Sequence, residues 1–170
     1  YIKYHKKNIS KHTYWRFNQK RKNNLSEKDN IICLENLIED SVKKRLIADV
    51  PVGLFLSGGI DSSLIAYYGK KYSSKIESFT IKMDNKSYDE SKFADEVSNH
   101  LKIKNHTLLL KENDLLESLS DIEEKIDEPI NDPSIIPTYL VSKLAKRHVK
   151  VALSGDGADE LFSGYAPFKY

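Results

Sequence analysis

This 170-residue sequence has one cysteine, one methionine and one tryptophan. A single cysteine, Cys33, excludes a disulfide framework and a cysteine zinc cluster within these residues. Cys33 falls in an amphipathic pattern, and we interpret it as a small core residue. No apolar run approaches the ~18 residues that a membrane span needs, and no signal peptide is visible. We therefore expect a cytoplasmic protein with no membrane partner.

The sequence also lacks a strong net charge, since 27 lysines and arginines face 25 acidic residues, and the formal net charge is +2. The distribution is uneven: residues 1–22 hold eight basic residues and no acid, whereas residues 112–132 hold nine acids and one lysine. A basic arm can contact nucleic acid or a membrane surface. Residues 1–25 show no clear period, however, and we interpret them as a solvated connecting arm without a nucleic-acid partner.

From Ser26 onward, apolar spacing predicts helices that alternate with strands. The predicted helices cover about 26–46, 63–71, 87–101, 115–126 and 136–148, and the predicted strands cover 50–56, 76–83, 105–110 and 149–153. This alternation predicts an α/β fold, a doubly wound and mostly parallel sheet with helices on both faces. His106 and His148 lie beside predicted strands, and we interpret them as packing or surface residues.

Two of the predicted helices carry start signals and a core stripe. Ser26 with Asp29, and Ser87 with Glu90, form capping boxes. In the first helix, the expected core face consists of Leu34, Ile38, Val42 and Leu46. In the helix that follows Ser87, it consists of Phe93, Val97 and Leu101.

A turn rich in glycine and serine, Leu56–Ser63, follows the first predicted strand. Two glycines let backbone amides approach an anion, three serine hydroxyls add donors, and the next helix presents its positive end. The turn lacks the lysine of a Walker loop and the spacing of a dinucleotide fingerprint. An acid in such a cradle, Asp61, repels phosphates unless a cation lies between them, which suggests Mg²⁺. The alternative is an ordinary strand-to-helix turn capped by Asp61 and Ser62.

A second turn, Leu153–Phe162, follows the last predicted strand and again combines small residues with acids. Asp156, Asp159 and Glu160 repel one another unless a cation or a cationic substrate group is present. Asp159 is the second candidate ligand of Mg²⁺, and Asp156 and Glu160 are candidates for positioning substrate or transferring a proton. The alternative is that Asp159 and Glu160 only cap a helix. In parallel sheets, ligands bind outside the carboxyl ends of strands, where both turns are expected.

The first turn resembles the pyrophosphate loop of ATP pyrophosphatases with the adenine nucleotide alpha-hydrolase-like fold. The longer segment Asp49–Leu64 is similar to glutamine-hydrolysing asparagine synthetases in particular. The same holds for Tyr88–Ser91, Asp127–Pro129, Asp132–Ser134, Pro137–Tyr139 and Leu153–Phe162. The resemblance extends from about Tyr14 to Tyr165 and implies a fragment of the synthetase domain, 26–170, preceded by the arm 1–25 from an N-terminal glutaminase domain.

The resemblance implies a role for each matched residue. Leu56 and Ile81 would border the adenine and ribose of ATP, and Asp61 and Asp159 would hold Mg²⁺ on the pyrophosphate. Glu160 would face the amino-acid substrate, and Asp156 would transfer protons, although some family members carry glutamate there. The remaining residues around ATP would be Ser57, Gly58, Gly59, Ser62, Ser63, Ser154 and Gly155.

The implied reaction has two steps. Aspartate attacks the α-phosphate of ATP, giving β-aspartyl-AMP and pyrophosphate, and ammonia released from glutamine then yields asparagine and AMP. Three other readings stay open: a related enzyme that amidates a sugar carboxylate or closes a β-lactam ring, a nucleotide-binding module without catalysis, and a nucleic-acid binder based on the basic arm. The sequence leaves the oligomeric state open, including a homodimer.

Overall fold

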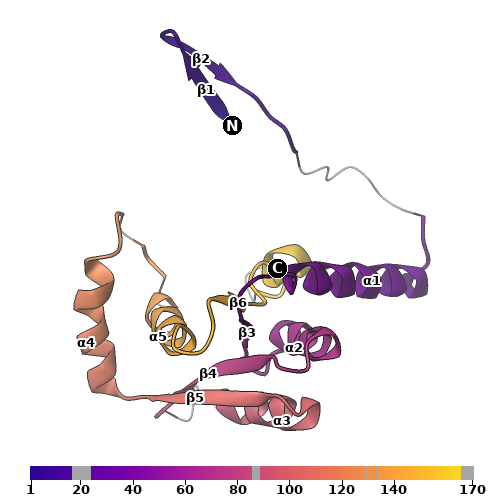
Figure 1. The fold of residues 1–170 in the computed structure, drawn as a ribbon. Helices are drawn as coiled ribbons and strands as arrows, with labels where there is room; N and C mark the ends of the chain where they lie inside the picture. Colours follow the sequence, from indigo (N-terminus) through magenta and orange to yellow (C-terminus); the bar gives the residue numbers. More distant parts are fainter. Residues whose placement is uncertain (17–23, 86–88, 129, 133, 166–170) are drawn as a thin grey trace. The chain divides into compact units, whose positions relative to one another are not determined.

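The computed structural model describes residues 1–16, 24–85, 89–128, 130–132 and 134–165. It contains two compact units, Tyr1–Glu35 and Asn36–Tyr170. The first unit holds an antiparallel hairpin of β1 (Ile2–His5) and β2 (Asn8–Lys11), in which Ile2 pairs with Lys11 (Figure 1). The sequence pattern missed this hairpin because its turn uses Lys6 and Lys7 at positive φ, 48° and 65°, where glycine or asparagine is usual.

Helix α1 (Glu27–Arg45) begins at the predicted cap. The backbone nitrogen of Asp29 donates to Ser26 Oγ at 3.2 Å, and Ser26 Oγ donates to Asp29 Oδ2 at 2.7 Å. Of the expected core face, Val42 is buried and Ile38 and Leu46 are half-buried, whereas Leu34 is exposed, contrary to the prediction. Cys33 is also exposed, so its interpretation as a core residue is wrong. The reason is that α1 buries no residue before Val42, so Leu34 beside Cys33 is exposed as well.

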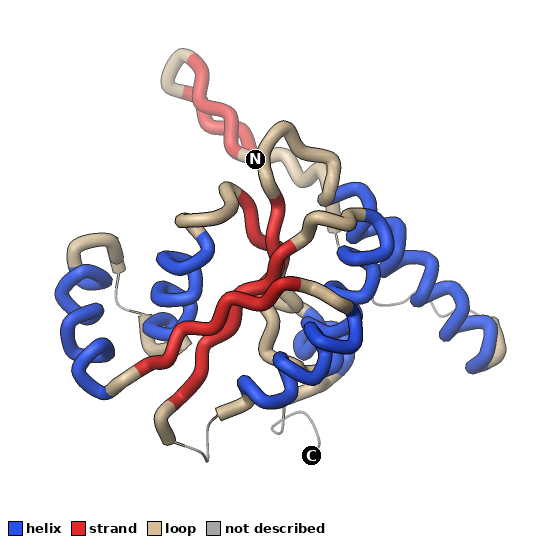
Figure 2. Tube along the Cα trace, turned by 60° about the horizontal axis from the view of Figure 1, so that its bottom comes forward, coloured by secondary structure: helices blue, strands red, loops and turns tan. Residues whose placement is uncertain are grey.

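The second unit is built on a four-stranded parallel sheet in the order β5-β4-β3-β6 (Figures 1 and 2). Its strands are β3 (Val52–Phe55), β4 (Glu77–Met83), β5 (Lys104–Leu110) and β6 (Val151–Leu153). Its helices after α1 are α2 (Ile60–Tyr72), α3 (Ser91–Leu101), α4 (Glu112–Glu123), α5 (Ile135–Ala145) and α6 (Ala158–Phe162). The predicted α/β class and parallel sheet are confirmed.

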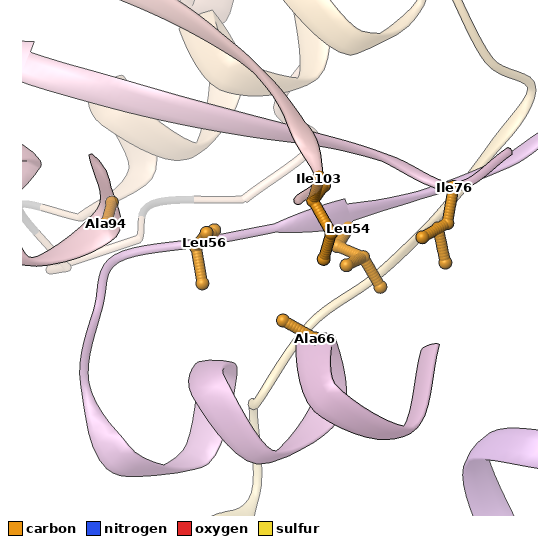
Figure 3. Close-up of a cluster of buried hydrophobic side chains, with 6 residues drawn as sticks. All are labelled: Leu54, Leu56, Ala66, Ile76, Ala94 and Ile103. Atoms are coloured by element: carbon orange, nitrogen blue, oxygen red, sulfur yellow. The ribbon is translucent and has the colours of Figure 1, made fainter. Parts of the chain in front are cut away.

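Two apolar clusters cover the two faces of this sheet. On one face, Leu54 of β3 and Leu56 just after it pack against Ala66 of α2 and Ala94 of α3 (Figure 3). On the other face, the fully buried Phe79 of β4 packs against Val141 and Ala145 of α5. Fully burying one such large side chain contributes about 1.5–3 kcal/mol. Helices therefore cover both faces, as the alternating pattern predicts.

Helix α3 buries part of the predicted face: Val97 and Leu101 pack against the core as expected, whereas Phe93 does not. Phe93 is 56% exposed, and the buried residues are Ser91, Ala94 and Ser98. These small side chains allow α3 to approach the loop after β3. The approach is so close that a β-carbon at Gly58 would lie only 2.5 Å from the backbone nitrogen of Ala94. Ser87, half of the predicted cap, lies outside the described residues.

The chain reverses its progress across the sheet at β3. It moves outward through β4 and β5 and then returns to place β6 on the other side of β3. Such a reversal is the position at which open parallel sheets bind ligands, at the carboxyl ends of the two diverging strands. None of the helices in the described segments is long and apolar enough to cross a membrane.

Candidate active site

The turn after β3 runs directly into the first turn of α2. The helix begins at Ile60, three residues earlier than predicted, so Asp61, Ser62 and Ser63 are helical. Gly59 is the N-cap, and no side chain caps this end. The first intrahelical bond runs from the backbone nitrogen of Ser63 to the Gly59 carbonyl at 3.0 Å. The amides ahead of it therefore form a donor group suited to an anion.

Serine hydroxyls fix the shape of this first turn. Ser57 Oγ lies 3.1 Å from Ser62 Oγ and accepts a hydrogen bond from the Gly59 backbone nitrogen at 3.2 Å. Ser62 Oγ donates to the Gly59 carbonyl at 3.2 Å. Ser62 is buried, whereas Ser57 and Gly59 are exposed. The buried hydroxyl of Ser62 thus stabilises the inner side of the turn, and the outer side is exposed to solvent.

The second turn lies against the first. A β-carbon added at Gly155 would be 3.0 Å from Asp61 Cβ and 3.2 Å from the Ser62 backbone nitrogen. The pairing of β3 with β6, in which Leu54 lies beside Leu153, brings these turns to the same edge of the sheet. The two glycine-rich turns, far apart in sequence, therefore form one site.

Leu56 and Ile81 lie on opposite faces of the sheet at this edge. Leu56 is 2% exposed and belongs to the cluster facing α2 and α3, whereas Ile81 is half-buried against the cluster facing α5. Thr80 Oγ1 donates to the Leu56 carbonyl at 2.8 Å. The Leu56 side chain is therefore too buried to contact a nucleotide. It instead packs beneath the turn and stabilises its position.

The carboxylates of the second turn have separate partners. Asp156 Oδ2 accepts from Ser154 Oγ at 2.8 Å. Glu160 Oε1 accepts from the Tyr165 hydroxyl at 2.8 Å. The Asp159 carboxylate lies against the backbone of Gly164, where a side chain would overlap it. Asp159 and Glu160 both fall in the first turn of α6, where negative charge suits the helix dipole.

Tyr165 is a member of this site that the sequence patterns did not single out. Its hydrogen bond to Glu160 raises the pKa of the Tyr165 phenol to about 12, with further contributions from the charges of Asp159 and Asp132. The same hydrogen bond lowers the pKa of Glu160. Glu160 is therefore held as an anion facing solvent.

The residues of the turns fit Mg²⁺ in their donor chemistry. Asp61 is half-buried beside Gly155, and within the described part of the chain its carboxylate has no hydrogen-bond or ion-pair partner. Mg²⁺ prefers oxygen ligands and is commonly bound by one or two carboxylates together with substrate phosphates. A free carboxylate beside uncapped helix amides is compatible with that arrangement.

Asp89, from the segment Tyr88–Ser91, joins two backbone segments by hydrogen bonds. Its Oδ1 accepts from the backbone nitrogen of Met83 at 3.2 Å and of Ser91 at 3.1 Å, which ties the end of β4 to the start of α3. Asp132 plays a similar part before α5, where its Oδ1 accepts from the Ser134 backbone nitrogen at 2.9 Å. Tyr88, Pro129 and Pro133 of these motifs lie outside the described residues.

Comparison with known proteins gives a consistent result. The family model described as "Asparagine synthase" matches residues 33–170. The chain is 40% identical over 141 residues to asparagine synthetase [glutamine-hydrolyzing] 1 of Bacillus subtilis, covering 82% of this chain and 22% of that protein. It is 33% identical over 164 residues to asparagine synthetase B [glutamine-hydrolyzing] of Escherichia coli, covering 86% of this chain and 29% of that protein.

The fold is also found among solved structures. The glutamine-dependent NAD⁺ synthetase from Acinetobacter baumannii, solved in complex with adenosine diphosphate, matches with a TM-score of 0.54 and 17% identity. The match covers 86% of this chain and 29% of that one. At this identity the likeness concerns the fold alone, and it agrees with the parallel sheet and its flanking helices.

Proposed function

Because this chain belongs to the asparagine synthase family, we propose that it forms the nucleotide-binding part of a ligase that uses ATP to convert aspartate into asparagine. The observation that carries this proposal is the contact of Gly155 with Asp61, which joins two anion-binding turns at the switch point of the sheet. The chain spans less than a third of the length of the two relatives described above. The activity of a complete enzyme is therefore part of this proposal.

In this proposal the first turn receives the phosphates of ATP. The uncapped amides at the start of α2 and the hydroxyls of Ser57, Ser62 and Ser63 supply donors. Gly59 keeps the outer surface of the turn free of a side chain, and Gly58 lets the loop approach α3. Ser154 and Gly155 contact ATP from the second turn. The buried Leu56 holds the loop in position from the core. The half-buried Ile81 is the apolar residue that would contact the adenine and ribose.

Asp61 and Asp159 are the residues that would hold Mg²⁺. The ion, when bound, neutralises charge that develops on the departing pyrophosphate. The chain's own part is to supply carboxylate oxygens from two different turns. Because Gly155 has no side chain, the turn that carries Asp159 can approach the one that carries Asp61.

The proposed first step is attack of a carboxylate oxygen of aspartate on the α-phosphate of ATP. The bond between the α- and β-phosphates breaks, and the products are β-aspartyl-AMP and pyrophosphate. Ammonia then attacks the acyl carbon, the bond to AMP breaks, and the amide loses a proton. No protein nucleophile is needed in either step, so the chain contributes orientation and charge stabilisation.

Glu160 and Asp156 have different parts in this scheme. Glu160 is exposed and held as an anion by Tyr165, which suits an ion pair with the amino group of the substrate. Asp156 is exposed and close to Ser154, and it would receive the proton that ammonia releases. We further propose that the ammonia comes from glutamine in an attached glutaminase domain and that the enzyme works in the cytoplasm. A homodimer is one possible oligomeric state.

The experiment is aspartate-dependent exchange of labelled pyrophosphate into ATP by the full-length protein, without glutamine or ammonia. Exchange requires reversible adenylation of the acceptor, so the proposal predicts exchange with aspartate and little without it. A sugar carboxylate that supports exchange better than aspartate would reassign the substrate. Absence of exchange with every carboxylate, in protein that binds ATP, would contradict the ligase function and favour a non-catalytic nucleotide-binding role.

A further inference from the structure

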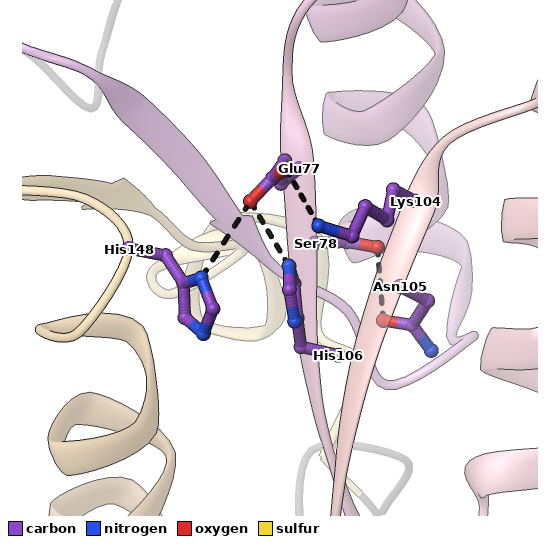
Figure 4. A network of polar contacts seen from close by, with 6 residues as sticks. All are labelled: Glu77, Ser78, Lys104, Asn105, His106 and His148. Carbon is purple, nitrogen blue, oxygen red and sulfur yellow. Dashed lines mark hydrogen bonds and ion pairs between the residues drawn. The ribbon is translucent and has the colours of Figure 1, made fainter.

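Three side chains with metal-binding atoms converge at the amino ends of the strands, opposite the edge that carries the glycine-rich turns. Glu77 begins β4, His106 lies on β5, and His148 lies between α5 and β6. Figure 4 shows both imidazole rings turned toward the Glu77 carboxylate. One ligand atom from each residue lies within 4.8 Å of the other two. The two histidines are thus parts of one cluster.

Glu77 divides its two oxygens between different neighbours. Its Oε2 lies 2.9 Å from His106 Nε2 and 4.0 Å from His148 Nδ1, whereas its Oε1 accepts from Lys104 Nζ at 3.3 Å. Burial acts to raise the pKa of Glu77, but the hydrogen bonds from His106 and Lys104 outweigh it, and the pKa is lowered. The lowered pKa favours the charged form of the Glu77 carboxylate, and Oε2 is the oxygen that faces both imidazoles.

The rings are held in place by packing before any ligand arrives. The His106 ring stacks on Phe79, with centroids 5.2 Å apart and an angle of 14° between the ring planes. The centroids of His106 and His148 are 4.0 Å apart. Phe79 is fully buried and pairs with His106 across the β4–β5 register. Such fixed rings lose little side-chain entropy when they bind an ion.

The cluster is also accessible. The side chains of His106, Glu77 and His148 are 15%, 28% and 33% exposed. Glu77 and His148 line a surface cavity of about 400 Å³. An ion can enter from this side, and the cavity leaves room for water as a further ligand.

We propose that Glu77, His106 and His148 bind a divalent late first-row transition metal, with Zn²⁺ as the best match. Two imidazoles and one carboxylate with an open position are typical of zinc, whereas Mg²⁺ favours oxygen ligands alone. Ligand atoms about 2.0–2.2 Å from zinc lie roughly 3.3 Å apart in a tetrahedron. His106 Nε2 and Glu77 Oε2, 2.9 Å apart, are already close to that spacing, whereas His148 Nδ1, 4.0 Å from Oε2, would have to move closer.

This ion would link β4, β5 and the segment before β6 at the edge of the sheet remote from the glycine-rich turns. It would stabilise the folded state by mass action, because the three ligands come together only on folding. The role is structural and independent of ATP binding. Its failure would leave the proposed ligase function unaffected.

The test is titration of the chelator-treated full-length protein with Co²⁺ and Zn²⁺, with visible absorption of Co²⁺ and thermal unfolding as readouts. Tetrahedral Co²⁺ bands that Zn²⁺ abolishes, and a rise in Tm with Zn²⁺ but not with Mg²⁺, are expected. His148→Gln should weaken Zn²⁺ binding by more than about tenfold, which is the least that loss of an outer-shell partner costs. His148 is the better target because it lies outside the strands and is more exposed than His106, which is part of β5.

The matched control is His100→Gln, which removes an exposed histidine of α3 outside the cluster. It should bind Zn²⁺ as the wild type does. Equal loss in both variants, or equal retention in both, would show adventitious binding and overturn the proposal. Absence of Zn²⁺ binding to folded wild type would overturn it as well and leave the cluster as a hydrogen-bonded network.

Discussion

The backbone of Gly155 lies against Asp61, so closely that a β-carbon at Gly155 would be 3.0 Å from the β-carbon of Asp61. Gly155 follows β6, and Asp61 lies in the first turn of α2, the helix after β3. The contact has a direct consequence: the spacing of the two turns is set by the absence of a side chain. Several expected outcomes rest on this and related contacts.

Substitution at Gly155 should weaken nucleotide binding in proportion to side-chain size. In Gly155→Ala the turns need to separate by a few tenths of an ångström, and in Gly155→Val they need to separate further. Overpacking of this kind costs about 1–3 kcal/mol, shared between folding and binding. Calorimetry with ATP measures the loss of binding free energy, and urea denaturation of the same variants measures the loss of folding stability. A valine variant that binds ATP with wild-type affinity would refute the close approach of the turns.

Gly58 and Gly157 offer a matched pair for backbone strain. Both have positive φ, 87° and 93°, but a β-carbon at Gly58 would clash with the backbone of α3, whereas at Gly157 it would meet nothing within 4 Å. Gly157→Ala should cost only the conformational penalty of about 1–2 kcal/mol. Gly58→Ala should cost about 1–3 kcal/mol more because of the clash. Equal free energies of unfolding for the two variants would contradict this packing of the first turn.

The Glu160–Tyr165 hydrogen bond predicts coupled titrations. Glu160→Gln should lower the pKa of Tyr165 from about 12 toward its ordinary value, because the charged acceptor is removed. Tyr165→Phe should raise the pKa of Glu160, because its donor is lost. NMR titration of labelled tyrosine and glutamate side chains measures both. Asp156→Asn is the control, since it removes another charge of the second turn and leaves this hydrogen bond intact; a similar shift there would argue against the assignment.

Asp89 predicts a component of acid sensitivity. Hydrogen bonds from Ser91 and Met83 lower the pKa of Asp89 in the folded state below its unfolded value. Its contribution to stability is therefore present above the unfolded pKa and is lost as pH falls through the folded pKa. Asp89→Asn should be less stable than wild type at neutral pH, and the gap should narrow in acid. Urea denaturation at both pH values gives the comparison, and a gap that stays constant with pH would count against it.

Most of the second unit could be predicted from sequence because its signals are periodic. Helices and strands from Ser26 to Leu153 follow apolar spacing, and both glycine-rich turns lie at strand ends as expected. Errors arose where small or polar residues decide the packing. Phe93 was assigned to the core, yet Ala94 takes that position because the loop at Gly58 approaches α3 too closely for a large side chain.

The rest depends on tertiary contacts that no local pattern contains. The hairpin turn at Lys6 and Lys7 has residues that are unusual at positive φ. Tyr165 reaches Glu160 only because α6 ends in a left-handed residue, Ser163, which turns the chain back. His106 and His148 are separated by 42 residues, and the return of the chain to the sheet after α5 brings them to Glu77. Contact between Gly155 and Asp61 likewise follows from strand order.

The most direct test of the proposed site is the affinity of the full-length protein for ATP with and without Mg²⁺, in wild type, Asp61→Asn and Asp159→Asn. Calorimetry should show Mg²⁺-dependent binding in wild type. Both variants should lose most of the enhancement by Mg²⁺ while keeping the weaker, metal-independent binding to the helix amides and serine hydroxyls. Binding that is equally strong without Mg²⁺, or unchanged in both variants, would contradict a nucleotide site built from the two glycine-rich turns.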